Sequence, residues 1–166
     1  MSNFESELNY LLENTLRSIL KIEERAICGY GKVNISINEM HMLEAIGKKS
    51  EKGEKDKKHV KISEVSQMMG ITLPSATVAI NKLVEKGFLI KEKCINDGRV
   101  MYVKLTALGE KINRMHSFFH KKISREIASE LEEEERQVLI KTVGKLNTFF
   151  MKTLERQKNK IGKSDK

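Results

Sequence analysis

The sequence predicts a mainly α-helical fold that contains one small β-hairpin. Two short helical segments lie on either side of Gly70, and two short apolar strands follow around a turn at residues 96–99. Longer stretches at both ends of the chain repeat apolar residues at helical spacing. This order of elements indicates a winged helix-turn-helix flanked by long helices, a shape that suits insertion of one helix into the major groove of DNA.

The composition limits the class of protein. The chain has 166 residues, of which 39% are hydrophobic and 33% charged, and it contains a single proline. We therefore expect one helix-rich domain over residues 1–166, large enough to bury a core. The net charge of +8 favours an anionic partner such as nucleic acid, although basic surfaces also occur without one.

Several classes of protein do not fit the motifs in the sequence. No apolar run reaches the roughly 18 residues of a membrane span, and the N-terminus is unlike a signal peptide. Cys28 and Cys94 are isolated, so we expect neither a disulfide framework nor a CxxC metal site. These features predict a cytoplasmic protein. The lack of G-x-S-x-G, P-loop and H-E-x-x-H patterns indicates that it is not an enzyme.

The N-terminal third is predicted to hold two helices and a charged loop. Residues 4–28 repeat Phe, Leu and Ile at helical spacing. Ser36 and Glu39 have the spacing of a capping box, which starts a second helix that we expect to end at Gly47. Residues 48–59 contain six lysines and no apolar residue. They predict a solvated loop, with contact to the phosphate backbone of DNA as the alternative.

The helix-turn-helix follows. Residues 62–69 form the first short helix, and Gly70 suits the left-handed position after it. Thr72 is a good N-cap for a second helix over residues 73–86. Its apolar inner face is predicted to comprise Val78, Leu83 and Val84. The residues expected to contact DNA, through hydroxyl, amide, ammonium and apolar groups, are Thr72, Leu73, Pro74, Ser75, Thr77, Asn81 and Lys82.

A wing is predicted directly after this helix. Residues 88–95 and 100–105 have the pattern of two strands, and residues 96–99 form the turn. Arg99 suits a narrow, A·T-rich minor groove, and Asp97 is expected to hold its guanidinium group in a charge-assisted pair. The alternative is an ordinary Asp-Gly turn beside a solvated arginine.

The long terminal helices predict a homodimer. Residues 1–32 and 107–157 carry more apolar surface than a winged helix of residues 33–106 can cover. A second copy of the chain is the simplest partner, and a twofold dimer suits a pseudo-palindromic operator in double-stranded DNA. The alternative is a monomer whose long helices fold over its own DNA-reading part. Residues 158–166 are predicted to form a flexible tail.

The wing region resembles the MarR family of transcription regulators. The resemblance rests on the residues Asp97-x-Arg99, Val103-x-Leu105-Thr106 and Gly109, preceded by an L-x-x-x-G pattern from Leu83 to Gly87. It implies an obligate dimer that binds DNA and regulates transcription. The order of elements matches the family over essentially the whole chain, whereas the Lys/Glu loop at residues 48–59 is not required by the family pattern.

Within the family, residues 35–48 and 115–121 are similar to the repressor of bacterial fatty-acid synthesis, which uses acyl carrier protein loaded with a fatty acid as corepressor. The resemblance implies a repressor controlled by a long-chain acyl group on acyl carrier protein or coenzyme A. Such a chain needs an adaptable apolar channel, for which methionine is suited. The residues expected to line it, unless they serve only as core, are Met40, Met42, Met115 and Phe119.

A zinc-responsive repressor of metal uptake is the second similar subgroup. Its zinc ligands match Glu23, His41, His116 and His120. One carboxylate and three imidazoles fit a four-coordinate site, and the last two histidines are spaced to share a helix face. The alternative is a hydrogen-bonded cluster that only orients helices. We favour the acyl effector over zinc. A rival from another class is a metal-binding or adaptor protein that does not bind DNA.

Overall fold

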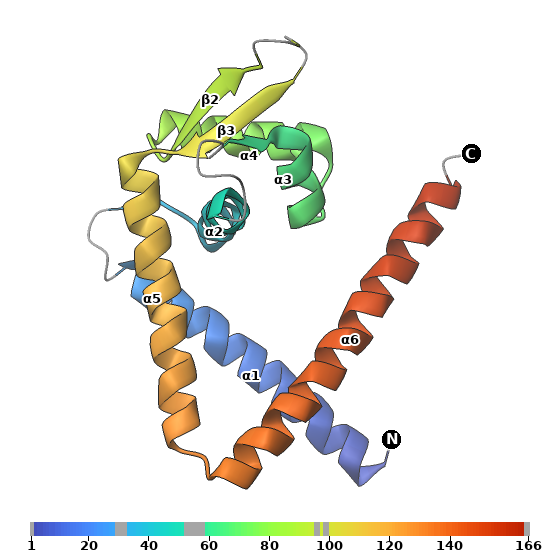
Figure 1. Ribbon diagram of the computed structural model, residues 1–166. Helices are drawn as coiled ribbons and strands as arrows, with labels where there is room; N and C mark the ends of the chain where they lie inside the picture. The colour runs from blue at the N-terminus through green and yellow to red at the C-terminus, as the bar shows by residue number, and fades with distance from the viewer. Residues whose placement is uncertain (1, 29–32, 52–58, 95–96, 98–99, 165–166) are drawn as a thin grey trace. The chain divides into compact units, whose positions relative to one another are not determined.

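The computed structural model describes residues 2–28, 33–51, 59–94, 97 and 100–164 (Figure 1). The chain forms two compact units, residues 1–119 and 120–166. The predicted organisation as one domain stays a prediction. The elements are α1 (Asn3–Cys28), α2 (Ile37–Glu51), β1 (Val60–Lys61), α3 (Ile62–Met69), α4 (Leu73–Glu85), β2 (Leu89–Lys93), β3 (Met101–Leu105), α5 (Ala107–Ser129) and α6 (Glu133–Ser164).

Helix α2 begins at the predicted capping box. The Ser36 N–H donates to Glu39 Oε2 at 2.8 Å, and the Glu39 N–H donates to Ser36 Oγ at 3.3 Å. The helix continues past Gly47 to Glu51, so the first four residues of the predicted loop 48–59 are helical. The remaining predicted loop residues, except His59, lie outside the described residues.

The predicted turn between α3 and α4 is confirmed. Gly70 has φ 65°, and its N–H donates to the Gln67 carbonyl at 3.2 Å. Thr72 Oγ1 accepts a hydrogen bond from the Ser75 N–H at 3.3 Å and caps α4. The first four N–H groups of a helix have no intrahelical partner, so Pro74 in this first turn costs no backbone hydrogen bond.

The β-sheet has three antiparallel strands in the order β1-β3-β2. The predicted hairpin is present: Leu89 pairs with Leu105 at one end and Lys93 with Met101 at the other. Strand β1 was missed, because two residues are too short to show an alternating pattern. It joins the sheet by pairing Val60 with Val103. In Figure 1 strands β2 and β3 lie side by side next to α4.

The hairpin joins α5 through one close approach. Thr106 Oγ1 donates to the Gly87 carbonyl at 2.7 Å and accepts from the Gly109 N–H at 3.0 Å. A Cβ atom on Gly109 would lie only 2.1 Å from the Phe88 carbonyl oxygen. The Leu-Thr-x-x-Gly pattern thus has a structural reason, since Thr106 caps α5 and a residue without a side chain lets α5 approach the chain before β2.

The core of the first unit lies among α2, α3, α4, the sheet and the start of α5. The fully buried residues of α4 are Ala76, Ile80 and Leu83. The predicted inner face was therefore wrong at Val78, whose side chain is 57% exposed. Successive helical residues are turned by about 100°, so Val78 points about 160° away from both Ala76 and Ile80.

The second unit contains the end of α5 and helix α6. The Glu132 N–H donates to Glu135 Oε2 at 2.9 Å, and Arg136 Nε donates to the Ala128 carbonyl at 2.9 Å, which ties the start of α6 to the end of α5. Helix α6 continues to Ser164, so residues 158–164, predicted as a flexible tail, are helical. Among the described helices none is both long and apolar enough to cross a membrane.

Candidate nucleic-acid interface and effector sites

Helix α4 presents a continuous outward face. The exposed residues include the predicted Thr72, Leu73, Pro74, Ser75, Asn81 and Lys82, with Thr77 half-buried beside them. Val78 belongs to this face as well, which the sequence analysis missed because an apolar residue beside Leu83 and Val84 was assigned to the core. The helix therefore offers a mixed apolar and hydroxyl-bearing surface with one ammonium group.

Several polar groups on this face already have partners. Thr72 Oγ1 and Ser75 Oγ are hydrogen-bonded at 2.8 Å, and the Thr77 hydroxyl donates to the Leu73 carbonyl at 2.8 Å. Asn81 Oδ1 accepts a hydrogen bond from Lys91 Nζ on β2 at 2.9 Å. These bonds fix side-chain orientations at the helix N-terminus and link α4 to the hairpin.

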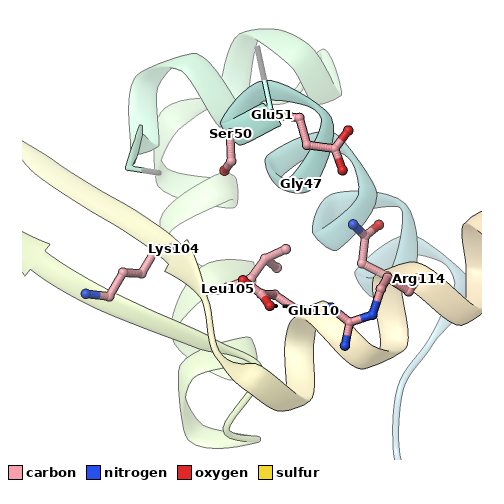
Figure 2. A pocket seen from close by; sticks show the side chains of 8 residues that line it. Gly47, Ser50, Glu51, Lys104, Leu105, Glu110 and Arg114 are labelled. Carbon is pink, nitrogen blue, oxygen red and sulfur yellow. Dashed lines mark hydrogen bonds and ion pairs between the residues drawn. The ribbon is translucent and has the colours of Figure 1, made fainter. Parts of the chain in front are cut away.

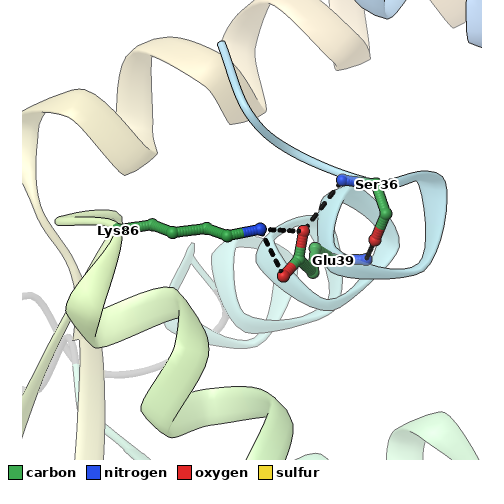
Figure 3. Close-up of polar contacts among 3 residues, drawn as sticks. All are labelled: Ser36, Glu39 and Lys86. Carbon is green, nitrogen blue, oxygen red and sulfur yellow. Dashed lines mark hydrogen bonds and ion pairs between the residues drawn. The ribbon is translucent and has the colours of Figure 1, made fainter.

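An ion pair holds the other end of α4 (Figure 3). Lys86 Nζ donates to both carboxylate oxygens of Glu39 at 2.8 Å. Burial alone would raise the pKa of Glu39, but the hydrogen bonds from Lys86 and Ser36 and the charge of Lys86 together hold that pKa below its ordinary value. Because Glu39 also caps α2, one carboxylate ties the first turn of α2 to the end of α4. The sequence did not reveal Lys86, which is 47 residues from Glu39.

A second polar cluster crosses the sheet. Glu92 on β2 pairs with Lys104 on β3, and its other oxygen lies 2.7 Å from His59 Nε2 beside β1. Hydrogen bonds from Lys104 and His59 and the charges of both residues lower the pKa of Glu92 against a smaller opposing effect of burial. Cross-strand register brings these residues together, and the missed strand β1 is why the cluster was not predicted.

The tip of the wing is described only in part. Asp97 is exposed, and its carbonyl accepts a hydrogen bond from the Val100 N–H at 2.9 Å. The Cys94 N–H donates to the Val100 carbonyl at 2.9 Å, which continues the hairpin beyond β2 and β3. Arg99 lies outside the described residues, so its predicted pairing with Asp97 stays a prediction.

Three of the four predicted metal ligands converge in the first unit. Glu23 on α1 and His116 on α5 are buried, and ligand atoms of the two side chains lie within 4.8 Å of each other. His41 Nε2 on α2 is 3.7 Å from Glu23 Oε2, and its ring centroid is 5.6 Å from that of His116. His120 lies four residues after His116 on α5, in the second unit.

Glu44 is a further member of this polar cluster. Its Oε2 lies 3.6 Å from His116 Nδ1. The sequence analysis missed it, although Glu44 follows His41 by three residues and therefore shares its face of α2. Carboxylates thus approach His116 from both α1 and α2. This arrangement serves either to hold a cation or to hold the three helices together by hydrogen bonds.

The four residues predicted to line an effector channel lie in or near the core of the first unit and do not line its pocket. Met40 and Met42 are buried in the core, Met115 packs against it, and Phe119 is half-buried. A pocket of about 260 Å³ opens elsewhere in the first unit, between α2, β3 and α5 (Figure 2). It is lined by Gly47, Ser50, Glu51, Lys104, Leu105, Glu110, Asn113 and Arg114. Asn113 Oδ1 is buried there without a hydrogen-bond partner among the described residues.

The helices α3 and α4, the turn at Gly70 and the β2–β3 hairpin define the class of winged helix-turn-helix proteins. A sequence profile for the transcriptional regulators SarA/Rot matches residues 29–115. FabT of Streptococcus pneumoniae, solved in complex with DNA, is 32% identical with a TM-score of 0.82, over 90% of this chain and 99% of that chain. The chain therefore belongs to the winged-helix transcription regulators of the MarR and SarA/Rot type, which its wing residues indicated.

Two further comparisons agree with this assignment. The zinc-responsive MarR-family member ZitR of Lactococcus lactis has a TM-score of 0.60 at 19% identity, over 86% of this chain and 99% of that chain, and so shares the fold. YhjH of Bacillus subtilis, an HTH-type transcriptional regulator, is 22% identical over 98 residues, or 59% of this chain. The match spans 51% of YhjH, about half the length of that relative. Relatives of this kind are regulators and not enzymes.

Proposed function

We propose that the protein is a homodimeric, sequence-specific DNA-binding repressor that places α4 in the major groove of a pseudo-palindromic operator. The observation that carries the proposal is the outward face of α4, which is free of core contacts while both ends of the helix are held by Thr72 and Lys86. A rigid helix with an exposed face can keep its side chains in register with base edges. The net charge of +8 favours the phosphate backbone.

Footprinting tests this proposal. The full chain is incubated with the promoter region of its own gene and with duplexes selected from a randomised library. We expect two protected half-sites with centres about 10 base pairs apart, and an affinity that falls steeply between about 50 and 200 mM salt. If no sequence is selected over competitor DNA, the alternative of a metal-binding or adaptor protein that does not bind DNA is favoured. Protection of a single asymmetric half-site would contradict the proposed dimer.

We propose a long-chain acyl group, carried by acyl carrier protein or coenzyme A, as the effector. The support is the resemblance over residues 35–48 and 115–121, together with methionines in the core and packed against it, a residue type that adapts to flexible ligands. A basic surface also suits an acidic carrier protein. Operator affinity is compared with acyl carrier protein loaded with a long chain and with the unloaded carrier, and only the loaded form should change it.

Zinc is the second candidate, favoured by the convergence of Glu23, His41 and His116. These residues would supply one carboxylate and two imidazoles, and the resemblance adds His120 as the fourth ligand. The chemistry of this donor set fits zinc, which requires ligand atoms about 2.0 to 2.2 Å from the ion. Operator binding is measured with added zinc and with a chelator, for wild type and His116→Ala. A response to zinc alone, lost in His116→Ala, would overturn the acyl proposal.

A further inference from the structure

The outward face of α4 has an apolar centre. Val78 is 57% exposed and Leu73 is 50% exposed, and Pro74 lies one turn before Val78 on the same side. A solvent-exposed β-branched residue contributes little to helix stability, because its χ1 freedom is restricted in a helix without any gain from burial. The exposed side chain of Val78 therefore contributes little to the stability of the first unit.

Most polar groups around Val78 on α4 already have hydrogen-bond partners within the chain. The hydroxyls of Thr72, Ser75 and Thr77 have partners within the chain, and so does the Asn81 carbonyl oxygen. Helix α4 carries no arginine or glutamine. Of the residue types that pair with guanine or adenine through two hydrogen bonds it has Lys82 and Asn81, and Asn81 Oδ1 already accepts a hydrogen bond from Lys91. A reading surface with few strong hydrogen-bonding groups has to obtain base discrimination from another source.

Val78 also lines a hollow on this surface. The hollow is lined by Ser36, Glu39, Pro74, Ser75, Val78, Ala79 and Lys82. Pro74, Val78 and Ala79 make part of it apolar, and Lys82 sits one turn after Val78. Lys82 is exposed on the same side of α4, where its ammonium group can reach a phosphate of a bound duplex.

We propose that Val78 is a specificity-determining residue that reads the 5-methyl group of thymine in the major groove. This inference rests on the proposed DNA-binding function and names the chemical group that α4 recognises. Thymine is the base that displays a methyl group in the major groove, and an apolar side chain recognises it by removing both groups from water. Burial of one methyl group corresponds to about a fourfold change in affinity.

The test replaces thymine by deoxyuridine, which lacks the 5-methyl group and keeps the same hydrogen-bonding edge. A duplex selected by the full chain is synthesised with deoxyuridine at one symmetric pair of thymines at a time. For the wild type we expect one pair whose replacement weakens binding by about fourfold per methyl group. Val78→Ala should bind the thymine duplex more weakly by a similar factor and show no further loss with deoxyuridine at that pair.

Val78→Ile is the matched control, since it keeps a β-branched apolar side chain at the same position and should retain the sensitivity to deoxyuridine. Circular dichroism of each variant checks that α4 is folded. Equal sensitivity of wild type and Val78→Ala at every pair would overturn the assignment to Val78, and insensitivity of the wild type at every pair would overturn methyl recognition. Lack of binding to any selected duplex would instead overturn the proposed function on which this inference rests.

Discussion

At the scale of single residues, contacts of one or two atoms decide how the elements of the first unit meet. Gly109 lets α5 approach the Phe88 carbonyl, and Thr106 closes the same junction with hydrogen bonds to Gly87 and Phe88. Glu39 similarly serves two elements with one carboxylate. Residues of this kind tolerate substitution poorly because the atoms that they face belong to the backbone or to a second helix.

Gly109→Ala should destabilise the protein by about 1 to 3 kcal/mol, because the new Cβ would lie 2.1 Å from a backbone oxygen that cannot move away cheaply. Gly144→Ala on α6 is the control, since its Cβ would meet no atom within 4 Å. There the gain in helix propensity should stabilise the protein by about 1 kcal/mol. Denaturant unfolding measures both, and equal effects of the two substitutions would contradict the close-approach argument.

Lys86→Met should destabilise the protein by about 1 to 3 kcal/mol at neutral pH, because it leaves the partly buried Glu39 carboxylate without its cation. The folded-state pKa of Glu39 lies below the ordinary glutamate value of 4.5, so this stabilisation is fully present above pH 4.5 and is lost as the pH falls through the folded-state pKa. The deficit of Lys86→Met should therefore shrink in acid.

Unfolding free energies of wild type, Lys86→Met and Lys82→Met at about pH 7 and pH 3.5 check this prediction. Lys82→Met removes an exposed lysine of the same helix and should show little change with pH. A Lys86→Met deficit that is the same at both pH values would show that the lysine acts through packing and not through its charge.

At the scale of elements, the fold presents α4 and the β2–β3 hairpin as two separate surfaces linked by the Lys91–Asn81 hydrogen bond. The hairpin is stiffened on one face by Glu92, Lys104 and His59. A stiff hairpin keeps strands β2 and β3 in a constant position against α4, which supports the proposal that the wing and α4 contact DNA together.

Arg99→Ala should weaken operator binding by about 1 to 3 kcal/mol and leave the oligomeric state unchanged. The reason is the sequence position of Arg99 at the turn between strands β2 and β3, outside residues 1–32 and 107–157, which are expected to form the dimer. Arg125→Ala on α5 removes the same charge outside the DNA-reading part and serves as the control. Fluorescence anisotropy with the selected operator gives the affinities, and wild-type affinity of Arg99→Ala would remove the wing from the proposal.

At the scale of the whole molecule, both units expose apolar side chains in quantity. Helix α1 exposes Leu11, Leu16 and Ile19, and α6 exposes Val138, Ile140 and Phe149. Apolar surface of this extent is typical of a protein–protein interface. It supports the proposal that both helices contribute to a homodimer.

Leu16→Glu and Ile140→Glu, tested separately, should shift the protein towards a monomer and abolish binding to a two-half-site operator, because a carboxylate buried in an apolar interface is costly. Lys145→Glu, also exposed on α6, is the control for a new negative charge on that helix. Analytical ultracentrifugation measures the oligomeric state. A dimer that persists in both variants would show that the apolar surfaces of α1 and α6 do not form the dimer interface.

Local features of the fold could be predicted from the sequence. The capping box at Ser36 and Glu39, the left-handed turn at Gly70 and the N-cap at Thr72 depend on residues three or four positions apart. Such signals operate within a single turn of chain, so the positions of α2, α3 and α4 and the hairpin pairing follow from neighbouring residues. The family resemblance rested on the same local pattern around the wing.

Only tertiary packing decided which apolar residues are buried and which residues far apart in the sequence pair with each other. Val78 and Leu83 are both apolar, and only the packing of α4 on α3 and β2 shows that the first points outward while the second is buried. The pairing of Glu39 with Lys86, the approach of Glu44 to His116 and the addition of β1 to the sheet join residues far apart in sequence. No local pattern specifies such pairs, because their distances are set by how whole elements pack together.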